Sequence, residues 1–153
     1  GQASGLLVGG NLSLVAAMLG SKSSLQTAGK ILLLEEVSEY KYTLDRMLMS
    51  LKRAGLFDNL AGLIIGGITA TKSDSETPFP ASIEDIIASK VAGFTYPVGF
   101  GFPAGHISNN LALKLGVHHN LLVGKHGTQL NELHPMNPLF PIPLISDSLE
   151  IKF

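Results

Sequence analysis

Two short, continuously apolar runs constrain the fold of this chain more than any other feature of its sequence. Residues 30–34 and 60–65 each have the length of one β-strand, and nearly every residue in them is apolar. A strand of this composition has to be covered on both faces, as the strands of a parallel sheet are. The two runs therefore predict an α/β domain built on a buried sheet.

Strand and helix patterns alternate around these two runs. Asn11 is a suitable N-cap for a first helix and Gly20 a suitable stop, while Gly55 ends a second helix and Ser82 caps a third. The expected elements are, in order, a strand over 4–10, a helix over 12–19, a strand over 30–34, a helix over 43–54, a strand over 60–65, a helix over 82–91 and a strand over 95–98.

The pattern changes after Gly99, where short apolar segments are separated by glycine-containing turns. Strands over 110–115, 120–123 and 128–133 would form an antiparallel meander. The predicted fold class is thus α/β, with a mixed sheet, two to three helices and a C-terminal β meander. We expect one domain over 1–134 and an extended, proline-rich tail over 135–153, because repeated prolines exclude a central strand.

The composition excludes several classes of function. A net charge of -1 in 153 residues gives no basic footprint for nucleic acid, and no apolar run approaches the length of a membrane span. The chain has no cysteine, so it has neither disulfides nor thiolate metal sites. Four of the five histidines match no known metal motif; they are His118, His119, His126 and His134. We expect no metal and no cofactor.

Two places in the sequence are candidates for chemistry. The first buried strand ends on acid at Glu35, with Glu36 and Glu39 close behind, and α/β proteins build sites at the carboxyl ends of their strands. The second is a tight loop rich in glycine and proline that presents His106. A strand that ends in solvated acids and a loop histidine that is simply exposed are common too, so both functional interpretations stay open at this point.

Three segments, in order and spacing, resemble one known family, the LD-carboxypeptidases, which include muramoyltetrapeptide carboxypeptidases and microcin C self-immunity proteins. The first is GGNL at Gly9–Leu12, before a short helix. The second is ILLLEEVSEYKYTLDRML at Ile31–Leu48, and the third is GFPAGHISNNLALKLG at Gly101–Gly116. The resemblance covers most of residues 5–133, and it implies the β/β/α sandwich of the family's C-terminal domain.

The resemblance implies a serine peptidase whose Ser-Glu-His triad is divided between two domains. Carried over by position, the triad glutamate is Glu35 and the histidine is His106, with Glu36 as the alternative acid if the register differs by one residue. No G-x-S-x-G elbow is present in the chain. We therefore expect the serine to come from an N-terminal domain of the same parent protein, and this chain to be inactive alone.

The resemblance also implies a function for the intact parent. Family members remove the terminal D-alanine from murein tetrapeptides in the bacterial cytoplasm, during cell-wall recycling, and we expect a homodimer. Two alternatives remain open in the sequence: a peptidase of the microcin C immunity type, acting on acyl-adenylate analogues, and a non-catalytic module that binds a peptide or a partner.

Overall fold

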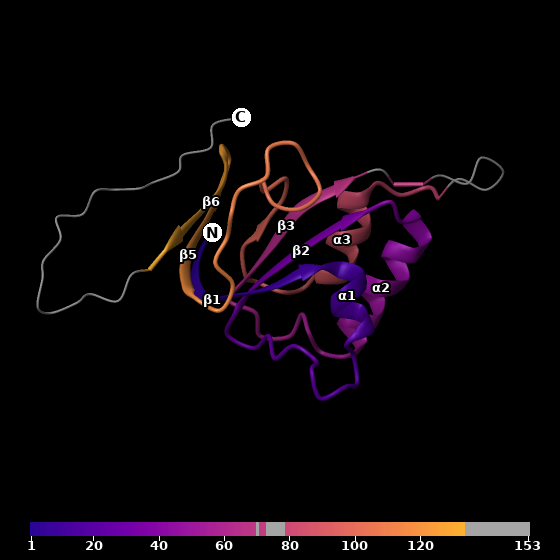
Figure 1. The fold of residues 1–153 in the computed structure, drawn as a ribbon, viewed down its shortest axis with the longest axis horizontal. Coiled ribbons are helices and arrows are strands. Elements are labelled where there is room, and N and C mark those ends of the chain that lie inside the picture. Colours follow the sequence, from indigo (N-terminus) through magenta and orange to yellow (C-terminus); the bar gives the residue numbers. More distant parts are fainter. Residues whose placement is uncertain (70, 73–78, 134–153) are drawn as a thin grey trace, which may run out of the picture.

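A computed structural model of the chain describes residues 1–69, 71–72 and 79–133. Within these residues four strands alternate with three helices over the first two thirds of the chain, and two further strands follow (Figure 1). They are β1 (Gln2–Asn11), α1 (Leu12–Ala17), β2 (Ile31–Val37), α2 (Lys41–Arg53), β3 (Gly62–Thr69), α3 (Ile83–Val91), β4 (Val98–Gly99), β5 (His118–Gly124) and β6 (Gly127–Glu132).

The six strands form one mixed sheet in the order β4-β3-β2-β1-β5-β6. Strands β1 to β4 run parallel to one another, whereas β5 runs antiparallel to both β1 and β6. The predicted mixed sheet is confirmed, and the three predicted helices are present. Since parallel strands end at one edge of a sheet, the carboxyl ends of β1, β2 and β3 meet there.

Strand β1 joins two layers of this sheet. Its first half, Gln2–Leu6, pairs with β5, and its second half, Leu7–Asn11, pairs with β2. The β5–β6 hairpin then lies over one face of the parallel strands: a Cβ on Gly62 would lie 2.5 Å from the side chain of Leu121. In Figure 1 this hairpin stands on one side of β2 and β3, and the helices lie on the other. The arrangement is the expected β/β/α sandwich.

Alternation along β2 divides its side chains between two cores. Leu32 and Leu34 pack against the helices, in a cluster that includes Leu48, Phe57 and Ile87. Ile31 and Leu33 face the opposite way, into a cluster that the β5–β6 hairpin and the loop after β4 cover; its other buried members are Leu7, Ile64, Phe102, Ala104 and Leu121. Residues 31, 33 and 35 therefore share the hairpin-side face of the sheet.

Several predicted boundaries were wrong. The strand expected over 110–115 does not form, because its backbone is used differently: Leu111 donates to the carbonyl of Pro103 and closes the loop that carries His106. The meander is thus a two-stranded hairpin, and His118 begins β5 instead of lying in a turn. Strand β2 continues to Val37, so Glu35 lies within the strand. The expected tail over 135–153 lies outside the described residues, as does His134.

No helix among the described residues is long and apolar enough to cross a membrane.

Substitution of two neighbouring leucines on β5 tests whether contact with the parallel strands holds the β5–β6 hairpin in place. Leu121 is completely buried and Leu122 is 46% exposed. We expect Leu121→Ala to lower the free energy of unfolding by about 2–5 kcal/mol, because it opens a cavity between the two layers. Leu122→Ala, the matched control, should change it by less than about 0.5 kcal/mol. Urea unfolding measures both values, and equal losses would contradict the layered packing.

Candidate active site

Glu35 lies near the carboxyl end of β2, opposite a β-bulge in β3. Leu34 pairs with Ile65 and Glu36 pairs with Ile68, so Gly66 and Gly67 of β3 together oppose Glu35. A bulge of this kind redirects a side chain next to a functional site. Glu35 lies on the hairpin-side face of the sheet and is only 7% exposed.

The two glycines of the bulge form the surface on which the His106 loop rests. A Cβ on Gly66 would lie 2.4 Å from the carbonyl oxygen of Ala104, and one on Gly67 would lie 2.4 Å from the side chain of Ile107. The backbone N–H of Gly67 donates to that same Ala104 carbonyl at 2.8 Å. Any larger residue at either position would push the loop away from β3.

Gly105 brings the loop directly over Glu35. Its φ is +107°, a conformation that residues with a side chain rarely adopt. A Cβ at this position would also lie 2.6 Å from Oε2 of Glu35. Glycine is therefore required at this position for two reasons: the backbone angle, and the close approach to the Glu35 carboxylate.

His106 meets Glu35 in this arrangement: its Nδ1 lies 2.9 Å from Oε2 of the carboxylate. The carboxylate side chain is 9% exposed, while the ring is 59% exposed. When Nδ1 carries the ring proton and donates a hydrogen bond to Glu35, Nε2 is the basic nitrogen. An exposed Nε2 can then accept a proton from a reacting group. The expected contact between these two residues is confirmed; their catalytic roles remain a prediction.

Glu36 faces the helix side and is fully engaged there. It accepts hydrogen bonds from the Asn11 amide, the Ser13 N–H, the Ser13 hydroxyl and the Val37 N–H, at 2.6–2.9 Å. Burial opposes ionisation of this carboxyl, but the hydrogen bonds, led by that of the Ser13 hydroxyl, outweigh burial and lower its pKa below the ordinary value. Glu36 thus anchors the start of α1, and the acid beside His106 is Glu35.

The serines near the proposed residues do not make a nucleophile. Ser13 donates its hydroxyl to Glu36, and Ser38 has a positive φ of 62° with its N–H bonded to the Thr69 carbonyl. Ser108 is exposed in the loop after His106. Among the described residues, the His106 ring has one side-chain hydrogen-bond partner, Glu35. Within the described part of the chain, no serine hydroxyl forms a hydrogen bond with this ring.

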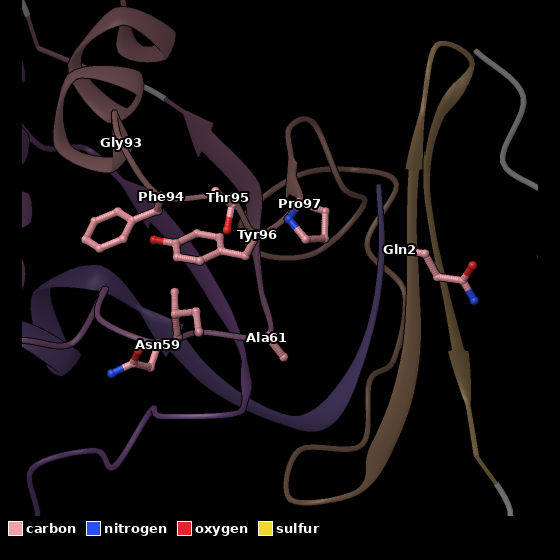
Figure 2. A pocket seen from close by; sticks show the side chains of 9 residues that line it. Gln2, Asn59, Ala61, Gly93, Phe94, Thr95, Tyr96 and Pro97 are labelled. Atoms are coloured by element: carbon pink, nitrogen blue, oxygen red, sulfur yellow. The ribbon is translucent and has the colours of Figure 1, made fainter.

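The described residues contain no group of three or more histidine, aspartate or glutamate side chains that could hold a metal ion. A cavity of about 470 Å³ lies elsewhere, at the amino ends of the strands, between Gln2, Asn59 and the Phe94–Pro97 segment (Figure 2). Tyr96 in its wall is stacked on Phe94, and burial, together with the charge of Asp58, raises the pKa of its phenol to about 12. This cavity is at the edge opposite to Glu35.

Residues 4–121 match the family model for the LD-carboxypeptidase C-terminal domain. The chain belongs to this family. It is 37% identical over 119 residues to a probable murein peptide carboxypeptidase of Bacillus subtilis, a match that covers 76% of this chain and 36% of the relative. It is 33% identical over 113 residues to the murein tetrapeptide carboxypeptidase of Pseudomonas aeruginosa, covering 73% of this chain and 36% of the relative. The chain thus spans about a third of the length of these relatives.

Solved structures of the family share the fold. The muramoyltetrapeptide carboxypeptidase of Oxalobacter formigenes superposes with a TM-score of 0.78 at 25% identity, covering 88% of this chain and 46% of that one. The microcin C7 self-immunity protein MccF superposes with a TM-score of 0.70 at 23% identity, covering 88% and 39%, and shows the fold alone. The comparisons thus place this chain in a family whose named members are carboxypeptidases.

The residues that hold the His106 loop in place were not predicted from the sequence. Gly66 and Gly67 directly follow the apolar run 60–65 in the sequence, and their role as the floor of the histidine loop depends on contacts with a segment about 40 residues further along the chain. A glycine pair directly after a buried strand is the signal that could have indicated a close backbone approach. Thr69 and Asn110, which also contact the loop, carry no comparable signal.

The lowered pKa of Glu36 makes a prediction about acid stability. A carboxyl whose pKa is lower in the folded than in the unfolded chain stabilises the fold above its unfolded pKa, and this stabilisation is lost as the pH falls through the folded pKa. We therefore expect the free energy of unfolding of the unmodified chain to fall more steeply between about pH 5 and pH 2 than that of Glu36→Gln. Urea unfolding across this range measures both slopes.

The matched control for this experiment is Glu84→Gln, which removes an exposed carboxylate from the first turn of α3. Its pH dependence should stay close to that of the unmodified chain. Equal slopes for the unmodified chain and Glu36→Gln would show that the Glu36 carboxyl is not the ionised anchor described above.

Proposed function

We propose that this chain supplies the glutamate and the histidine of a Ser-Glu-His triad, in an LD-carboxypeptidase that removes the terminal D-alanine from murein tetrapeptides. The observation that carries the proposal is the 2.9 Å contact between Nδ1 of His106 and the buried carboxylate of Glu35, made by an otherwise exposed ring. The relatives named for murein peptides support the substrate class.

The geometry suits a division of roles between the two residues. Glu35 holds the ring in the tautomer with the proton on Nδ1, and its charge stabilises the imidazolium that forms during the reaction. Nε2 then takes the proton from the serine hydroxyl as the oxygen attacks the peptide carbonyl, and it passes this proton to the departing amine of D-alanine. The low exposure of Glu35 keeps water from weakening its interaction with the ring.

The serine and the donors that stabilise the tetrahedral intermediate are assigned to an N-terminal domain of the same protein. The open side of the His106 ring is where that hydroxyl would approach, and the relatives are about three times as long as the segment they share with this chain. In this arrangement the described residues form half of a composite active site.

The longer protein that contains this chain provides the test. We expect it to release D-alanine from a murein tetrapeptide, and Glu35→Gln and His106→Gln each to lower kcat by a factor on the order of 10³ or more. The control is His126→Gln, in the turn between β5 and β6, which should leave turnover unchanged. Full activity of either variant would show that the substituted residue is not part of the triad.

A second substrate in the same assay separates the alternatives that the sequence leaves open. Cleavage of an acyl-adenylate analogue, with no turnover of the tetrapeptide, would indicate a peptidase of the immunity type. Binding of either compound without turnover would indicate a non-catalytic module.

The chain of 153 residues, purified alone, should hydrolyse no murein tetrapeptide above background. A base and an orienting acid without a nucleophile or an oxyanion hole can do no more than activate water, and most of the rate enhancement is then absent. D-alanine release, measured with and without a serine-directed inhibitor, provides the readout. Inhibitor-sensitive cleavage by this chain would contradict the composite site and require a nucleophile among its own serines.

A further inference from the structure

The loop that carries His106 follows β3 through contacts spaced two residues apart. The Phe102 N–H donates to the carbonyl of Ile65 at 3.0 Å, and the Gly67 N–H donates to the carbonyl of Ala104 at 2.8 Å. The next position in this ladder belongs to Thr69 and His106. There the backbone donor is replaced by a side chain: the Thr69 hydroxyl donates to the carbonyl of His106 at 3.1 Å.

A second side chain holds the loop from its other end. Oδ1 of Asn110 accepts a hydrogen bond from the backbone N–H of Gly105 at 3.0 Å. The neighbouring Leu111 N–H donates to the carbonyl of Pro103 at 2.9 Å and closes the base of the loop. Asn110 and Thr69 therefore fix the backbone immediately before and immediately at His106.

These two contacts matter because the ring itself has little other support. The His106 side chain is 59% exposed, so packing does not set its direction, and Gly105 beside it has no side chain to restrict the backbone. What sets the direction of the ring is the position of the peptide units on both sides of its Cα. A displacement of the backbone by about 1 Å would be enough to take Nδ1 out of hydrogen-bond reach of Glu35.

We infer that Thr69 and Asn110 are positioning residues for the base of the active site. The hydrogen bonds of both side chains go to the backbone and not to the His106 ring; each fixes a backbone group that determines where the ring lies, and together they keep Nδ1 against Glu35. The part of this inference that concerns turnover rests on the proposed function, whereas the part that concerns the geometry of His106 does not.

The geometric part can be tested in this chain alone by nitrogen NMR of the histidine rings, with the His106 signals identified by their loss in His106→Gln. The spectra report which ring nitrogen carries the proton. In the unmodified chain, near neutral pH, we expect the neutral His106 ring to be protonated on Nδ1. Glu35→Gln defines the reference for a ring without its carboxylate.

Thr69→Val and Asn110→Ala should each shift His106 toward the spectrum of Glu35→Gln, while urea unfolding shows that the fold is retained. Thr69→Ser keeps the hydroxyl and should restore the original spectrum. The matched control is Asn109→Ala, because Asn109 is the exposed neighbour of Asn110 and makes no side-chain hydrogen bond within the described part of the chain. Unchanged His106 signals in folded Thr69→Val and Asn110→Ala would overturn the inference.

The catalytic part is tested in the longer protein with the murein tetrapeptide. We expect Thr69→Val and Asn110→Ala to lower kcat roughly ten- to a hundredfold, with KM within about twofold, because a misplaced base slows proton transfer without removing a substrate contact. A rise in KM at constant kcat would overturn the positioning role. If the unmodified protein releases no D-alanine at all, the proposed function fails, and the NMR result still decides the geometric part.

Discussion

The contact between Glu35 and His106 joins an almost fully buried carboxylate to a largely exposed ring. Removing a carboxylate from water is costly unless a hydrogen-bond donor or a positive charge compensates for the lost hydration. Glu35 obtains such a donor from a loop about 70 residues away in sequence, and this requirement explains much of the local architecture. The β-bulge, the glycine pair of β3 and Gly105 all allow the backbone of the loop to come close enough for the ring to reach Oε2.

The adjacent pair Glu35 and Glu36 shows how one strand can supply two carboxylates with different tasks. Successive side chains of a strand point to opposite faces, so Glu36 lies among the hydrogen-bond donors at the start of α1, while Glu35 lies under the His106 loop. With four hydrogen bonds, Glu36 has a lowered pKa and no lone pair left to orient a histidine. Within the described residues, the Glu35 carboxylate has one hydrogen-bond partner, an imidazole that can itself exchange a proton. The difference in chemistry comes from the two environments and not from the side chains.

Much of this organisation was predictable from the sequence, because it depends on local patterns. Two buried runs separated by helical periodicity indicated the α/β sheet, and the family resemblance brought Glu35 and His106 together. The choice between Glu35 and Glu36 was not local, since it depends on which face of β2 the distant loop covers. The false strand over 110–115 has a similar origin. Leu111, Leu113 and Leu115 alternate as in a strand, yet the hydrogen bond from Leu111 to Pro103 commits this segment to the loop.

The supports of His106 also bear on how a divided active site can be assembled. Under the proposed function, the base has to be in place before the domain with the nucleophile docks, since any ordering left for the encounter would reduce the rate of the reaction. In this chain the ordering is internal: β3 supplies the floor of the loop and the hydroxyl of Thr69, and the loop supplies Asn110 to its own backbone. Under the proposed function, the remaining geometric requirement falls on the domain that brings the serine hydroxyl to the exposed ring.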